Sequence, residues 1–191
     1  YDIKRFTEMD PEQFIATTEE GELSDAFWNT VLVQRLDTSV SSSPYFLLFL
    51  MAQVKLGSRG FLSEQIDVAS LIQQRGDIHH IFPKKYLQKN GINNRKDYNQ
   101  IANYAYTQSE INIKIKDDAP CVYMAEMKKQ VTGGELQYGG ITDENDLKNN
   151  LAENCVPEEF VNMDIRNYKE FLEKRRVLMA GFIHRFYNSL G

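Results

Sequence analysis

Gly76-Asp77-Ile78-His79-His80-Ile81-Phe82-Pro83 is the stretch around which the rest of this sequence is organised. It contains two of the three histidines of the chain, side by side in an apolar run that Pro83 ends. Neighbouring side chains of a β-strand point to opposite faces, so His79 and His80 should do the same. A bend in the strand, or a metal ion at its edge, would let both imidazoles border one site. A half-buried structural pair is the alternative interpretation.

A second segment, residues 101–114, adds two asparagines to this pattern. Asn103 follows the short apolar pair Ile101-Ala102, and Asn112 lies in a stretch with helical character. We expect residues 99–107 to supply a second strand and the residues after Ser109 to form a short helix. The order strand, strand, helix with His and Asn side chains indicates a small polar site.

In these residues the chain resembles the HNH (ββα-metal) nuclease motif, in which a β-hairpin and the following helix clamp one divalent cation. The resemblance covers residues 76–120. It implies that His80 is the general base and that His79 is a metal ligand. It also implies that Asn103 fixes the hairpin and orients the base, and that Asn112 is a second metal ligand.

The wider context, from Gly76 to Leu87 and from Ile101 to Ile115, is similar to the C-terminal half of GmrSD-like proteins. Those proteins join an N-terminal ParB-like nucleotide-hydrolysing domain to an HNH domain in defence against foreign DNA. The sequence begins at Tyr1 without Met and contains nothing similar to that N-terminal domain. We therefore expect the C-terminal part of a larger restriction protein, with DNA, including modified DNA, and the absent NTPase-like domain as partners. The 191 residues alone should cut weakly or with little selectivity.

The residue types suit the hydrolysis of a phosphodiester bond. A neutral imidazole accepts a proton from water near neutral pH, as the role of His80 requires. One His and one Asn ligand would leave most positions on the cation to water and phosphate, as Mg²⁺ or Mn²⁺ prefers. Many family members place Asp or Glu where this chain has His79, which keeps Ni²⁺ and Zn²⁺ open. Asp77 is a candidate carboxylate for orienting an imidazole or for binding the ion itself.

Charge is distributed unevenly along the chain. The net charge is −5 overall, but residues 76–130 carry nine basic and six acidic side chains. This excess of positive charge lies where a polyphosphate would dock. A solvated lysine-rich face is the alternative. The candidate phosphate contacts are Lys84, Lys85, Lys114 and Lys116.

Cysteine usage and hydropathy limit the cellular setting. Cys121 and Cys155 have unrelated surroundings and do not make a disulfide framework, which favours the reducing cytoplasm. Neither cysteine has a partner at zinc-finger spacing. The longest apolar run, residues 45–52, is too short to span a bilayer, so we expect no membrane partner.

The fold class that we predict is α+β and mostly α-helical, with a helical scaffold that carries a small ββα-metal insert. Residues 1–75 would form a helical N-terminal part, residues 76–130 the HNH-like core, and residues 131–191 a helical part that packs on the first. Trp28 and the phenylalanines should be core residues. Lys174, Arg175 and Arg176 should form a solvated face of the last helix, and a face toward nucleic acid is the alternative. His184 in the same helix should be structural or exposed. Helices are expected at residues 10–17, 24–36, 44–56, 63–74, 84–89, 109–116, 119–130, 142–154 and 168–190.

Three functions remain compatible with these patterns. The first is a metal-dependent DNA endonuclease domain. The second is a non-catalytic nucleic-acid-binding or interaction module that has an HNH-like fold, and the third is an unrelated helical scaffold. Geometry distinguishes them, because a nuclease site requires His79, His80 and Asn112 to converge around one ion and its water, roughly 2 to 5 Å apart.

Overall fold

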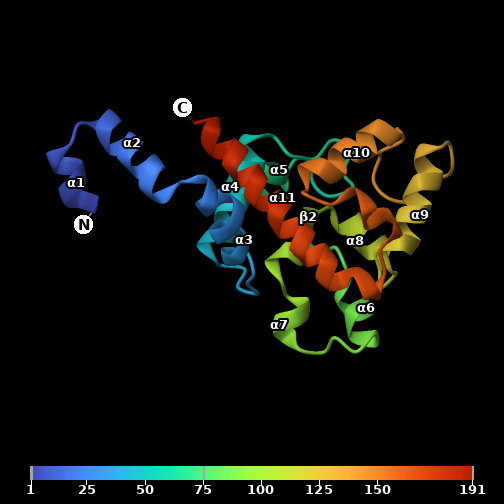
Figure 1. Ribbon diagram of the computed structural model, residues 1–191. Helices are drawn as coiled ribbons and strands as arrows, with labels where there is room; N and C mark the ends of the chain where they lie inside the picture. The colour runs from blue at the N-terminus through green and yellow to red at the C-terminus, as the bar shows by residue number, and fades with distance from the viewer. Residues whose placement is uncertain (1, 75, 191) are drawn as a thin grey trace.

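The computed structural model describes residues 2–74 and 76–190, apart from the side chains of Asp2 and Asp77. It is mostly helical with one small antiparallel sheet, which confirms the predicted α+β class. Within the described part of the chain, no helix is both long and apolar enough to cross a membrane. Figure 1 shows helices packed around the hairpin and a long C-terminal helix that crosses the molecule.

The elements follow one another in a simple order. The sheet consists of β1 (Asp77–His80) and β2 (Tyr104–Thr107). Short turns of other helix types are η1 (Phe27–Val31), η2 (Ile101–Asn103), η3 (Glu158–Asn162) and η4 (Ile165–Asn167). The α-helices are α1 (Asp2–Glu8), α2 (Pro11–Glu22), α3 (Leu32–Arg35), α4 (Pro44–Lys55), α5 (Val68–Gln73), α6 (Lys84–Lys89), α7 (Arg95–Tyr98), α8 (Ser109–Ile115), α9 (Pro120–Val131), α10 (Glu144–Glu153) and α11 (Tyr168–Asn188).

Helix starts agree well with the local sequence. Asp10 caps α2 by accepting a hydrogen bond from Gln13 N, and Pro11 occupies the first turn. Ser43 caps α4 in the same way, before Pro44. Helix α6 has the bounds that its sequence predicts. Helix α2, in contrast, continues to Glu22, beyond the expected end at residue 17.

The second strand is shorter than the sequence suggests. Residues 101–103 form the 3₁₀ turn η2, and only the four residues after it pair with β1. Asp77 lies opposite Thr107, and His80 lies opposite Tyr104. Backbone groups of η2 bond elsewhere, since Ile101 N donates to the carbonyl oxygen of Thr38. Tertiary contacts of a buried segment therefore replace the expected strand pairing. Residues 95–98, just before this segment, form the short helix α7.

Helix α11 holds the predicted parts of the chain together. It contacts α3 and α4 from the N-terminal part and η2 from the motif region. Figure 1 shows it as the red helix that passes in front of β2. Its residues Tyr168 and Phe171 form a buried aromatic cluster with Phe82 and Phe160. Phe82 belongs to the motif, so the core of the protein supports the segment after β1 directly.

Arg175 of α11 corrects the prediction of a solvated basic face. Its side chain is fully buried, and its guanidinium donates to the carbonyl oxygens of Ala102 (2.9 Å) and Asn154 (3.1 and 3.3 Å). Burial lowers its pKa to about 10. The neighbouring charges lie nearer the surface, where Lys174 pairs with Glu159 at 3.0 Å and Arg176 with Asp37 at 3.0 Å. Three adjacent basic residues on a helix point in different directions, so only one reaches the core.

Aromatic residues near the N-terminus divide between core and surface. Trp28 is buried and stacks on His184 (ring centroids 4.3 Å apart, planes 6° apart), which agrees with a structural role for this histidine. Phe6 is 58% exposed, contrary to the expectation that the phenylalanines are core residues. Its ring contacts Phe14 across the α1–α2 pair, which extends away from the body in Figure 1. A helical pair with little body contact cannot bury both of its faces.

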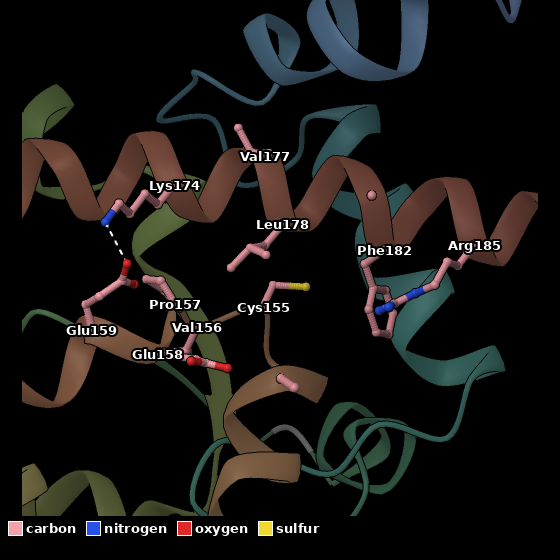
Figure 2. A pocket seen from close by; sticks show the side chains of 12 residues that line it. Cys155, Val156, Pro157, Glu158, Glu159, Lys174, Val177, Leu178, Phe182 and Arg185 are labelled. Atoms are coloured by element: carbon pink, nitrogen blue, oxygen red, sulfur yellow. Dashed lines mark hydrogen bonds and ion pairs between the residues drawn. The ribbon is translucent and has the colours of Figure 1, made fainter. Parts of the chain in front are cut away.

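An apolar groove lies beside α11, on the side of residues 155–159 (Figure 2). Cys155, Leu178 and Phe182 line it, and the Lys174–Glu159 ion pair lies at its rim. None of the motif residues lines this groove. It is therefore separate from the site described next.

Candidate active site

Asn103 fixes the chain immediately after β1. Its side chain is fully buried at the end of η2. The amide oxygen accepts from Phe82 N (2.8 Å), while the amide nitrogen donates to the carbonyl oxygens of Phe82 (3.1 Å) and Tyr98 (3.3 Å). Ile81 N donates in turn to the carbonyl oxygen of Asn103 (2.8 Å). One amide thus joins three segments of the hairpin, as an Asn side chain with a donor and an acceptor can.

His79 and Asn112 are brought together from two elements. Asn112 lies in the middle of α8, which starts two residues after β2 and contacts β1. The Nδ1 atom of His79 lies 2.7 Å from the Oδ1 atom of Asn112, within hydrogen-bond distance. The hairpin-helix connection therefore places these two predicted metal ligands side by side.

A loop from the N-terminal part covers this pair. Phe61 stacks on the His79 imidazole (ring centroids 5.9 Å apart, planes 16° apart), and His79 is only 3% exposed. The loop is tied to β2, because Phe61 N donates to the carbonyl oxygen of Tyr106 (2.8 Å) and the Thr107 hydroxyl donates to that of Phe61 (2.7 Å). The loop that covers His79 is therefore itself fixed to the hairpin.

The donor set suits a divalent cation. An imidazole nitrogen and an amide oxygen, adjacent but on different elements, are donor types that Mn²⁺ and other transition metals accept, and they differ from a sulfur-rich structural zinc site. In the contact itself the amide oxygen accepts, so Nδ1 of His79 carries the proton, and a bound ion would replace this hydrogen bond. Among the described residues, no three His, Cys, Asp or Glu side chains gather closely enough to share an ion. The HNH resemblance assigns the ion to His79 and Asn112. The predicted role of the Asp77 side chain lies outside the described residues.

His80 faces a different environment from His79. Of the three residues expected to converge, the structure brings His79 and Asn112 together, whereas the contacts of the His80 ring are with other residues. Its Nε2 atom lies 3.0 Å from the Oδ1 atom of Asn99. The edge of the ring meets Tyr104 at 5.0 Å between centroids, and Tyr98 lies at 6.4 Å. Burial lowers the pKa of His80, and the charge of Lys84 acts in the same direction, while the Asn99 contact opposes both. The imidazole is therefore neutral near neutral pH, the form in which a base accepts a proton.

The four predicted phosphate contacts are all exposed lysines. Lys84 lies over the ring of Tyr98, with its Nζ atom 5.2 Å from the centroid, and its charge reaches His80. Lys114 and Lys116 occupy the last turn and the C-cap of α8, the helix that carries Asn112. Lys85 lies close enough to Asp117 to contribute to the lowered pKa of that carboxyl, which Lys89 causes chiefly. The four lysines thus lie on α6 and at the end of α8, outside the core.

Sequence reasoning missed two residues that contact the histidines. Asn99 lies 19 positions after His80, in a polar stretch that resembles any surface loop. Phe61 lies in the N-terminal part, which offered no chemistry from its sequence. Neither residue carries a local pattern that points to a site. Only the path of the chain brings them to the imidazoles.

No family model matches the chain, and comparisons with curated proteins and with solved structures also give no match.

Proposed function

We propose that this protein is a metal-dependent endonuclease domain of the HNH type, which hydrolyses phosphodiester bonds of DNA. The observation that carries the proposal is the 2.7 Å contact between His79 on β1 and Asn112 on α8, in a hairpin closed by Asn103. The contact joins the two residues that the HNH resemblance names as metal ligands. The contact is therefore the main support for the HNH interpretation.

Each residue has a distinct role in this proposal. His79 and Asn112 hold a divalent cation, which when bound supplies positive charge for the phosphate and the leaving oxygen. His80 accepts a proton from the attacking water, and its neutral form suits that task. Asn103 keeps the strand end, and with it both histidines, in place.

Charge around the motif supports a nucleic acid as the substrate. Lys84, Lys114 and Lys116 are exposed beside the elements that carry the histidines and Asn112. Lysines contact phosphates without reading sequence, so the surface suits backbone binding. We assign target selection to other parts of the proposed larger protein, including an NTPase-like domain.

A plasmid-cleavage assay with Mn²⁺ or Mg²⁺ tests the nuclease. His80→Ala should lower the cleavage rate by about 10² to 10⁴ while the protein stays folded, because the base serves the reaction. Asn149→Ala, on the exposed face of α10, is the control and should cut at the wild-type rate. Wild-type turnover by His80→Ala would refute the base assignment. Parallel assays on modified DNA and on RNA define the substrate.

Metal binding is measured separately by calorimetric titration with Mn²⁺. His79→Ala and Asn112→Ala should each weaken binding by at least about 10- to 100-fold, the loss expected for a residue that supports a ligand. His80→Ala should bind Mn²⁺ as the wild type does, because the base contacts water. Equal weakening in all three variants would make His80 a ligand and require a different base.

One observation favours a second candidate, a non-catalytic nucleic-acid-binding module. His79 is almost fully buried and already contacts Asn112, as in a structural pair. Such a module would bind DNA in a salt-dependent manner and cut none with any divalent metal. Fluorescence anisotropy with labelled duplex DNA, combined with the cleavage assay, separates the two functions.

A further inference from the structure

The environment of His80 contains a polar partner that the HNH resemblance does not assign. Asn99 places its amide oxygen 3.0 Å from Nε2 of the imidazole. The rings of Tyr104 and Tyr98 also contact the imidazole. Among the hydrogen bonds of the described residues, the Asn99 amide is the one that reaches this ring.

An amide oxygen can only accept a hydrogen bond. A neutral imidazole carries its proton on one nitrogen, and the bond made by that nitrogen determines which one it is. With Asn99 Oδ1 opposite Nε2, the proton lies on Nε2 and the lone pair on Nδ1. The contact therefore determines both the tautomer and the direction in which the ring offers its basic nitrogen.

Asn99 is itself held in place by the core. It caps α7, and its N–H donates to the carbonyl oxygen of Arg95 (3.1 Å). The adjacent residue, Tyr98, accepts the hydrogen bond from the Asn103 side chain. The hydroxyl of Tyr168 on α11 donates to the carbonyl oxygen of Asp97 (2.8 Å). A segment anchored at Asp97 and Tyr98 presents the next side chain in a defined position.

We infer that Asn99 is a positioning residue: its amide oxygen accepts the Nε2–H of His80 and leaves Nδ1 to take the proton from the attacking water. The inference rests on the proposed nuclease function. It also gives a physical route by which the buried Asn103 orients the base. Asn103 fixes the backbone of Tyr98, and Asn99 then holds the imidazole.

The tautomer is measured directly by long-range ¹H–¹⁵N correlation NMR on protein with ¹⁵N-labelled histidine. His80→Ala assigns the signals. The wild type should show the Nε2–H form, and Asn99→Ala should show a mixture of both tautomers. Asn99→Asp keeps an acceptor oxygen and should restore the Nε2–H form. Asn93→Ala, at an exposed position just before α7, is the control and should resemble the wild type.

Cleavage kinetics supply the second readout. Asn99→Ala should lower kcat by about 10- to 100-fold with KM nearly unchanged, and Asn99→Asp should recover a substantial part of the loss. An unchanged kcat with a raised KM would make Asn99 a substrate contact and overturn the inference.

Failure of the positioning role of Asn99 can be distinguished from failure of the nuclease function. An active wild type with the Nδ1–H tautomer refutes the role of Asn99 and leaves the nuclease proposal standing. A wild type that keeps the Nε2–H tautomer but cuts no DNA, with Mn²⁺ or Mg²⁺, refutes the nuclease function, and with it the positioning role. The thermal transition of Asn99→Ala should match that of the wild type. Changes in its tautomer or kcat then result from loss of the contact with the His80 ring.

Discussion

Replacement of Asn103 by alanine tests the central connection of the site. The side chain is fully buried and makes three hydrogen bonds, one accepted from Phe82 N and two donated to the carbonyl oxygens of Phe82 and Tyr98. Alanine removes the partner of all three backbone groups. Phe82 is fully buried and Tyr98 is 6% exposed, so water has little access to these groups.

The expected loss of stability follows from those contacts. A hydrogen bond contributes about 1 kcal/mol net, and each buried group left without a partner costs about 1 to 3 kcal/mol. The longest of the three bonds, at 3.3 Å, is the weakest. We therefore expect Asn103→Ala to lower the free energy of unfolding by about 3 kcal/mol, which in a chain of this size lowers Tm by about 6 to 12 °C.

Urea unfolding followed by circular dichroism measures this change, with Asn149→Ala as the exposed control. Asn103→Asp tests the direction in which the stability of the variant changes with pH. Its carboxylate would face two carbonyl oxygens in a buried position, which raises its folded-state pKa above the unfolded value of about 4. Its stability relative to wild type is then greatest at low pH and falls as the pH rises through the folded pKa. A loss of unfolding free energy below about 1 kcal/mol for Asn103→Ala would refute the idea that the Asn103 side chain fixes this part of the chain.

Two further predictions concern α11 and the groove beside it. Arg175→Lys should lower the free energy of unfolding by about 3 kcal/mol, because one ammonium cannot reach both Ala102 and Asn154. Arg176→Lys, at the pair with Asp37, should lower it by about 1 kcal/mol or less. Urea unfolding measures both variants, and equally small losses would contradict the buried role of Arg175. Burial raises the pKa of the Cys155 thiol to about 12. A thiol reagent near pH 8 should therefore modify Cys121 first and reach Cys155 only on unfolding, as mass spectrometry would show. Rapid labelling of Cys155 in the native protein would contradict this prediction.

Much of the local structure is predictable because its causes are local. Asp10-Pro11 and Ser43-Pro44 determine helix starts through caps and a restricted backbone, and α6 lies between Pro83 and the Asn90-Gly91 pair. The limits of β2 were not predictable in this way. Whether residues 101–103 extend a strand or form a turn depends on Thr38 and Arg175, far away in the chain.

The sequence by itself determined the residue types of the candidate site and their order, His79, His80, Asn103 and Asn112, because motif spacing is a property of the chain. The tertiary structure decided which of them touch. His79 meets Asn112, while His80 meets Asn99, because adjacent strand residues face opposite ways and each face has its own neighbours. The tertiary structure also decided which residues are buried. Arg175 is a core residue because the carbonyl oxygens of Ala102 and Asn154 converge on it. That convergence exists only after distant segments have packed together.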